Sequence, residues 1–134
     1  MRLLIFGAGV LGTFYAVKLL ACGHDVTVLA RGRRAAQIQA DGLVVQEYGR
    51  SCLRARISVI ETLEPEQSYD YVLVLVRNDQ VESVIPLLAA NEATPSLVFM
   101  FNNLDGPARL IDVLGRERVL LGFRGAAGER LASG

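Results

Sequence analysis

The stretch RLLIFGAGVLG, Arg2–Gly12, places a short apolar run directly before a glycine-rich loop. The apolar run, Arg2–Phe6, is typical of a buried β-strand. After the loop, apolar residues recur at three- and four-residue spacing, which predicts an amphipathic helix. A strand, a G-x-G-x-x-G loop and a helix in direct succession form the fingerprint of a dinucleotide-binding unit. This stretch therefore predicts the start of an α/β domain that binds a dinucleotide.

Each glycine of the loop has a separate role in this fingerprint. Gly7 allows the tight turn, Gly9 lets the backbone approach a pyrophosphate, and Gly12 lets the helix pack close to the strand. The start of the helix adds free N–H groups and the positive end of the helix dipole. The alternative is a tight turn between strand and helix that binds no ligand. The residues expected to hold the cofactor diphosphate are Gly7, Ala8, Gly9, Val10, Leu11 and Gly12.

The rest of the chain alternates strand and helix patterns. Further strands are predicted at Val26–Leu29, Tyr69–Val76, Ser96–Phe101 and Val119–Phe123. Helices are predicted through Gln37–Ala40, over Asp79–Ala90 with a kink or break at Pro86, and over Ala108–Leu114, with Gly23 and Gly115 as helix ends. A β-hairpin is predicted from Leu43–Tyr48 and Cys52–Ile60. The alternation predicts an α/β fold of the Rossmann type, with a doubly wound, mainly parallel sheet.

Arginines follow the second predicted strand, where an NAD-binding domain usually carries an Asp or Glu. A carboxylate at that place accepts hydrogen bonds from the ribose hydroxyls of NAD and repels a 2′-phosphate. Arg31 stands there instead, and Arg33 and Arg34 follow it. Because a guanidinium pairs with phosphate, we expect Arg31 to bind the 2′-phosphate of NADP(H), with Arg33 or Arg34 adding to the contact. The alternative is a solvated cationic turn.

Length and composition limit the other classes of function. The 134 residues suit one domain, expected at 1–124, with a linker-like tail at 125–134. A net charge of zero does not suggest a nucleic-acid-binding surface, and no apolar run has the length of a membrane span. The start does not resemble a signal peptide, so we expect a cytoplasmic protein with Cys22 and Cys52 as buried thiols. No metal-ligating cluster is predicted.

Four segments together resemble the ketopantoate reductase (2-dehydropantoate 2-reductase) family. They are LLIFGAGVLGTFYAVKLLACGHDVTVLARG from Leu3, the turn DGL from Asp41 with its predicted hairpin, VLVLVRNDQ from Val72, and FNNLDGPARLIDVLGRERVLLG from Phe101. The resemblance implies that Arg31 binds the 2′-phosphate and that Arg77 stands where the family often has a cofactor-contacting lysine. It implies that Asn102 contacts the nicotinamide side and the substrate. Asn103 and Asp105 stand where the family usually has glycines.

The resemblance also implies a function, namely hydride transfer from NADPH to a small 2-oxo acid, as in pantothenate biosynthesis. The resemblance implies that the family's catalytic lysine lies on a C-terminal helical domain, which we expect to lie outside these 134 residues, and Lys18, the one lysine, belongs to the predicted first helix. We therefore expect this chain to bind NADP(H) without turnover and to hold no catalytic residue itself. We also expect an exposed apolar surface and self-association into a homo-oligomer.

Two alternatives remain open at this point. One is a non-catalytic module that senses NADP(H) and signals through a partner, because the chain carries no visible catalyst. The other is a related dehydrogenase that acts on a different 2-oxo or 2-hydroxy acid. Asn102 itself also has a second interpretation as a turn or helix-cap residue, a role that Asn often takes.

Overall fold

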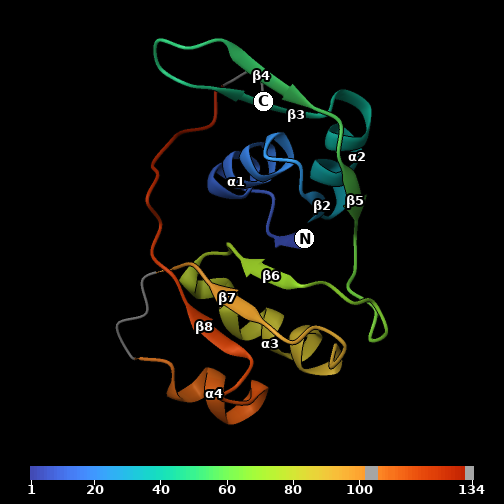
Figure 1. The fold of residues 1–134 in the computed structure, drawn as a ribbon, viewed down its shortest axis with the longest axis vertical. Coiled ribbons are helices and arrows are strands. Elements are labelled where there is room, and N and C mark those ends of the chain that lie inside the picture. Colours follow the sequence, from blue (N-terminus) through green and yellow to red (C-terminus); the bar gives the residue numbers. More distant parts are fainter. Residues whose placement is uncertain (102–105, 132–134) are drawn as a thin grey trace.

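A computed structural model describes residues 1–101 and 106–131 as a parallel sheet between helices, with a separate hairpin (Figure 1). The main sheet contains β1 (Arg2–Phe6), β2 (Asp25–Leu29), β5 (Ser58–Ile60), β6 (Tyr71–Val74), β7 (Leu97–Phe99) and β8 (Val119–Leu121). The helices are α1 (Val10–Ala21), α2 (Gly32–Asp41), α3 (Val81–Ala90) and α4 (Ala108–Leu114), and a 3-10 turn, η1 (Asn78–Gln80), precedes α3. The hairpin consists of β3 (Leu43–Gln46) and β4 (Cys52–Ala55).

The strand order of the main sheet is β5-β2-β1-β6-β7-β8, and every neighbouring pair is parallel. From β1 the chain builds the sheet outward to β2, and it then returns to the other side of β1 with β6. The direction of winding therefore reverses between β1 and β6. In such sheets, ligands bind outside the carboxyl ends of the strands at this switch point. The predicted doubly wound, mainly parallel sheet is confirmed.

Both faces of the central strand β1 are buried. Leu3 and Ile5 of β1 belong to the apolar cluster that includes the buried residues of α1 and α2. Leu4 and Phe6 belong to the opposite cluster, which includes the buried residues of α3 and α4. Since successive side chains of a strand point to opposite faces, a strand covered on both sides must be apolar throughout. This requirement explains why the pattern of the central strands could be predicted.

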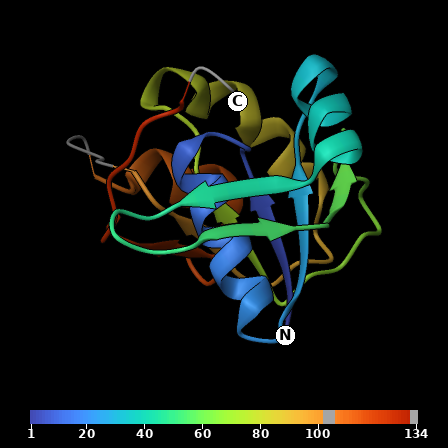
Figure 2. The same ribbon diagram turned by 90° about the horizontal axis from the view of Figure 1, so that it is seen from above.

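The β3–β4 hairpin lies across α1, on the side away from the sheet (Figure 2). Lys18 of α1 joins it to the domain through an ion pair with Glu47, whose Oε2 lies 2.7 Å from the lysine Nζ. The prediction that the second hairpin strand runs through Cys52–Ile60 is wrong. It divides into β4 and β5, and β5 pairs with the outer edge of β2. That pairing supplies β2 with hydrogen-bond partners on its second side.

The helices also differ from prediction in two places. The helix through Gln37–Ala40 begins at Gly32, so Arg33 and Arg34 lie in its first turn and not in a surface turn. The predicted break at Pro86 is wrong, because α3 is continuous from Val81 to Ala90. Its buried residues include Val84, Ile85 and Leu88, so packing against the sheet holds the helix together around the proline.

The expectation of buried thiols is wrong, because Cys22 and Cys52 are both free and exposed. Cys22 is the C-cap of α1, where the chain turns away from the core before Gly23, whose φ is +87°. Cys52 is an exposed residue of β4, a strand on which exposed and partly buried positions alternate. A terminal position and an outward strand register therefore override the usual burial of cysteine.

Residues 122–131 contain no helix or strand and run from β8 back along the domain toward α1 and the hairpin (Figure 1). The backbone N–H of Gly125 donates to the Tyr15 hydroxyl at 3.3 Å. A Cβ on Gly128 would lie 3.0 Å from Cγ1 of Val10, so this segment packs against the start of α1. In the described part of the chain, no helix combines the length and apolarity needed to cross a membrane.

Candidate functional site

Two glycines of the loop are required by packing. Gly7 has a φ of +114°, and a Cβ there would lie 2.7 Å from the carbonyl oxygen of Leu75. A Cβ on Gly12 would overlap the carbonyl oxygen of Gly7. Gly7 therefore lets the turn approach the end of β6, and Gly12 lets α1 approach the turn. Both glycines lie at the switch point of the sheet, between β1 and β6. Their roles in packing do not by themselves indicate a ligand.

Gly9 differs from the other two, because a Cβ there would meet no atom within 4 Å. It is the N-cap of α1 with ordinary extended backbone angles, and no side chain caps this helix. The first hydrogen bond of the helix runs from the Thr13 N–H to the Gly9 carbonyl oxygen, at 2.9 Å. The N–H groups at the start of α1 precede that bond and are donors for an anion. The open space beside Gly9 fits the approach of a diphosphate.

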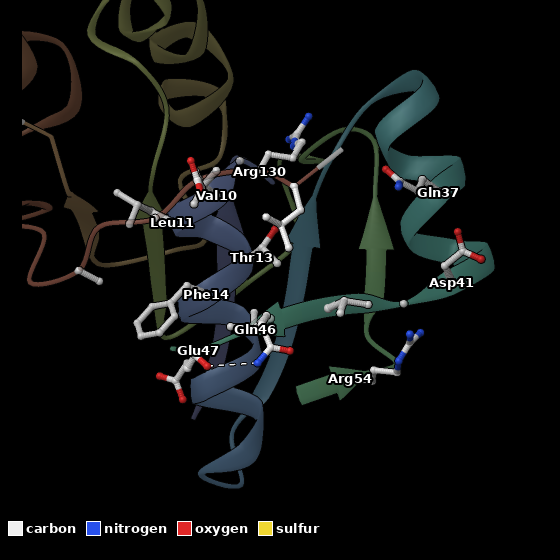
Figure 3. Close-up of a pocket in the computed structure, with 18 of the residues that line it drawn as sticks. Val10, Leu11, Thr13, Phe14, Gln37, Asp41, Gln46, Glu47, Arg54 and Arg130 are labelled. Carbon is white, nitrogen blue, oxygen red and sulfur yellow. Dashed lines mark hydrogen bonds between the residues drawn. The ribbon is translucent and has the colours of Figure 1, made fainter. Parts of the chain in front are cut away.

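A cavity of about 1190 Å³ opens beside this loop (Figure 3). It is bounded by the start of α1, by α2, by the β3–β4 hairpin and by residues 126–131. Gly9, Val10 and Leu11 line one end of it. Arg77 does not line it, so the cavity covers the loop and the side of the switch point toward α2, and does not extend to the end of β6.

Arg31 is exposed at the N-cap of α2, directly after β2. Its Nε donates to the carbonyl oxygen of Glu61 at 3.4 Å. The Glu61 carboxylate accepts a hydrogen bond from the Gly32 N–H at 3.0 Å and so occupies the start of α2. Sequence reasoning missed Glu61, because the hairpin prediction placed Cys52–Ile60 away from β2. An acidic side chain thus lies beside the arginine that was expected to bind phosphate.

Arg34 reaches from α2 to the glycine-rich loop. Its Nε donates to the Ala8 carbonyl oxygen at 3.1 Å, and its Nη2 donates to the Thr13 hydroxyl at 2.9 Å. Nη1 donates to the Gln37 amide oxygen at 2.9 Å. The side chain is half-buried and lines the cavity. The structure therefore brings Arg34, and not Arg31, into contact with the predicted phosphate loop.

The surroundings of Arg34 disfavour its positive charge. Burial, followed by repulsion from the Arg130 guanidinium, lowers the pKa of Arg34 below its usual value. Arg130 lies in the segment 126–131 that borders the cavity, and Figure 3 shows it above the start of α1. Two cations thus converge next to the positive end of a helix dipole. This arrangement attracts an anion.

Arg77 follows β6 at the same edge of the sheet, but its side chain lies at the surface and pairs with Asp79. Nε and Nη2 donate to the two carboxylate oxygens at 3.0 and 2.8 Å. Its predicted contact with the cofactor stays a prediction. Asn102, the predicted nicotinamide and substrate contact, lies outside the described residues. Within residues 1–101 and 106–131, no group of three His, Cys, Asp or Glu side chains could hold a metal ion.

The strand order, the switch point and the open glycine-rich loop define a Rossmann-type dinucleotide-binding domain. More particularly, the chain belongs to the ketopantoate reductase PanE/ApbA family, whose model matches residues 3–134. This family consists of oxidoreductases that use a nicotinamide cofactor.

Two curated proteins similar to this chain carry names for different functions. A 2-dehydropantoate 2-reductase of Mesorhizobium japonicum is 28% identical over 117 residues, which cover 80% of this chain and 36% of the relative. A Trk system potassium uptake protein, TrkA, of Mycobacterium tuberculosis is 29% identical over 104 residues, covering 77% of this chain and 46% of that protein. The chain thus spans less than half the length of both relatives.

Solved structures share the fold. A 2-dehydropantoate 2-reductase from Geobacter metallireducens superposes with a TM-score of 0.76 at 28% identity, covering 90% of this chain and 40% of that one. A D-mandelate dehydrogenase solved with NADH and anilino(oxo)acetate gives a TM-score of 0.79 at 20% identity, covering 92% and 40% of the two chains. At that identity the second match supports the fold alone.

Proposed function

We propose that this chain is the NADPH-binding domain of a reductase that acts on a small 2-oxo acid, of the 2-dehydropantoate 2-reductase type found in pantothenate biosynthesis. The observation that carries the proposal is the open backbone at Gly9 beside an uncapped α1, within a chain of the ketopantoate reductase family. Gly7–Gly12 would hold the diphosphate through backbone N–H groups. When bound, the nicotinamide supplies a hydride to the keto carbon of the substrate.

The chain's own residues would bind and orient the cofactor and leave proton transfer to another part of the protein. The single lysine, Lys18, forms an ion pair with Glu47 of the hairpin, on the opposite side of α1 from the sheet. Lys18 therefore joins α1 to the hairpin and is not proposed as the proton donor. A lysine on a helical domain would supply the proton, as the family resemblance implies. Arg77 and Asn102 would contact the nicotinamide end, and Asn102 the substrate.

We propose NADPH as the cofactor, and not NADH, because two arginines lie near the end of β2, where the adenosine ribose is expected. Arg31 lies at the end of β2, and Arg34 lies against the loop itself. A guanidinium favours a 2′-phosphate, whereas the carboxylate usual after this strand repels it. Cys22 and Cys52 are free thiols, which accords with the reducing cytoplasm as the proposed location.

Isothermal titration of the protein with NADPH and with NADH at matched salt tests this function. We expect tighter binding of NADPH, and no ketopantoate-dependent oxidation of NADPH by the 134-residue chain. Absence of binding by either dinucleotide would refute the proposal. Turnover of ketopantoate by this chain alone would refute the assignment of proton transfer to another domain.

One other function has a supporting observation, and a second is consistent with the fold. Similarity to TrkA, a potassium uptake protein by name, supports a non-catalytic module that binds NADP(H) and signals through a partner. The fold match to D-mandelate dehydrogenase is consistent with a related dehydrogenase of another 2-hydroxy acid. Binding of NADPH without reduction of any 2-oxo acid, when the chain is assayed together with a helical domain of the family, would favour the first of these.

A further inference from the structure

We infer that Arg34, three residues beyond the expected position, is the residue that selects the 2′-phosphate of NADPH. This inference rests on the proposed function, and it names a specificity-determining residue for the same site. Its basis is the arrangement of the two arginines at the start of α2. Arg31 and Arg34 lie one turn apart, but they face different surroundings.

Arg31 is poorly placed to attract a phosphate. Its Nε is directed to the Glu61 carbonyl oxygen, and the Glu61 carboxylate binds the next backbone N–H, that of Gly32. A phosphate drawn to Arg31 would have to approach that carboxylate. Like charges repel over several ångströms at an exposed site, so Glu61 offsets part of the attraction. Arg31 is also exposed, so its own charge is well solvated.

Arg34 has the opposite character. Its three hydrogen bonds go to neutral acceptors, namely the Ala8 carbonyl, the Thr13 hydroxyl and the Gln37 amide. Among the described residues it has no ion pair with an acidic side chain, although it is half-buried. A guanidinium has five N–H donors, and three of them serve these acceptors. Among residues 1–101 and 106–131, the other two donors have no hydrogen-bond acceptor, so they can bind phosphate oxygens.

The position of Arg34 fits the 2′-phosphate in particular. Its acceptors come from the β1–α1 loop, from α1 and from α2, so its charge lies between the start of α1 and the end of β2. In this fold, the diphosphate lies at the start of α1, and the adenosine ribose extends toward the end of β2. A 2′-phosphate on that ribose would place a negative charge beside the guanidinium groups of Arg34 and Arg130. Burial and Arg130 already lower the pKa of Arg34, and this anion would relieve both effects.

The test is titration of wild type, Arg34→Ala, Arg31→Ala and the distant exposed control Arg116→Ala with NADPH and NADH. Adenosine 2′,5′-bisphosphate and 5′-AMP serve as probes of the adenosine half alone. We expect Arg34→Ala to weaken NADPH and the bisphosphate by about 10- to 100-fold, as for a lost charge-assisted hydrogen bond, and NADH and AMP by less than about 2-fold. Arg31→Ala should have a smaller effect on NADPH, and Arg116→Ala almost none.

A second variant, Arg34→Lys, distinguishes a loss of binding from a loss of folding in Arg34→Ala. Arg34→Lys keeps the charge but not the planar fork, and we expect it to retain part of the NADPH preference with an unchanged melting temperature. Equal losses for NADPH and NADH in Arg34→Ala would place the residue on the diphosphate and overturn the inference, as would a larger loss in Arg31→Ala. If wild type binds neither dinucleotide, the proposed function fails. If it also fails to bind the bisphosphate, so does this inference.

Discussion

Nη2 of Arg34 donates to the Thr13 hydroxyl at 2.9 Å and so joins the first turn of α2 to the first turn of α1. Thr13 is buried in α1, one residue after the last glycine of the loop. The contact fixes the guanidinium beside the loop before any ligand arrives. An arginine held in this way loses less side-chain entropy when it binds a phosphate than one that is free in solvent.

Thr13→Val tests this positioning role. Valine has nearly the shape of threonine but cannot accept the hydrogen bond, so Arg34 would be less well oriented. We expect NADPH affinity to fall by about 2- to 10-fold, as for loss of one hydrogen bond, with NADH affinity unchanged. Thr13→Ser keeps the hydroxyl and should restore the preference. If serine and valine behave alike, the hydroxyl has no part in orienting Arg34.

Gly9→Ala and Gly12→Ala should separate binding from folding. The Cβ of Gly9→Ala points into open space, so we expect a loss of stability below about 1 kcal/mol but a loss of dinucleotide affinity of about 10-fold or more. The Cβ of Gly12→Ala overlaps the Gly7 carbonyl oxygen, so we expect it to destabilise the domain by about 1–3 kcal/mol. Chemical denaturation and NADPH titration measure the two effects. Full affinity in Gly9→Ala would contradict a diphosphate at this loop.

Glu61→Gln should raise the affinity for NADPH. Glutamine keeps an oxygen that can accept the Gly32 N–H but removes the negative charge beside Arg31. We expect an increase of about 2- to 5-fold at low salt, which shrinks as salt is added because the site is exposed. Glu66→Gln makes the same change of net charge farther along the same connection and should have no effect. An equal gain for NADH would mean that Glu61 does not act on the 2′-phosphate.

The sequence predicts the central sheet of this protein better than its binding site. A strand covered on both faces must be apolar, so Arg2–Phe6 could be placed with the bounds of β1. The arginines depend on a different property. Whether Arg31 or Arg34 faces the loop is decided by the residue at which α2 begins, and Gly32 carries no unambiguous signal of that start.

Glu61 shows a second limit, which concerns pairing between distant segments. Residues Ser58–Ile60 have the pattern of a strand, and that pattern fits a hairpin with Leu43–Gln46 as well as the edge of β2. Only the pairing with β2 brings Glu61 next to Gly32. The local pattern therefore predicts that a strand exists, whereas its neighbour, and hence the acidic residue at the site, depends on the whole fold.

The ion pair between Lys18 and Glu47 predicts a dependence of stability on pH. The hydrogen bond from Lys18, together with the charges of Lys18 and Arg50, lowers the pKa of Glu47 below its usual 4.5, against an opposing effect of burial. A carboxyl with a lowered pKa in the folded state stabilises that state above its unfolded pKa. The stabilisation is lost as the pH falls through the folded pKa.

Glu47→Gln should therefore lower the melting temperature near pH 7, and this difference from wild type should shrink as the pH falls through the folded-state pKa of Glu47. Thermal unfolding followed by circular dichroism over this range measures the difference. Glu92→Gln, at an exposed position elsewhere, is the control for net charge. A difference in melting temperature that is constant with pH would mean that the ionised form of Glu47 does not hold the hairpin on α1.

The edge of the sheet at β8 carries apolar side chains that are open to solvent. Leu120, Leu121 and Phe123 are 44, 50 and 86% exposed. An edge strand also offers unpaired backbone groups, so this strip favours association with a second copy of the chain. We expect light scattering to show a concentration-dependent increase in mass that Leu121→Lys and Phe123→Ser reduce. Tyr48→Ser removes a fully exposed aromatic side chain from the hairpin and should leave the association unchanged. A wild-type protein that stays monomeric at high concentration would show that the strip does not bind a second copy.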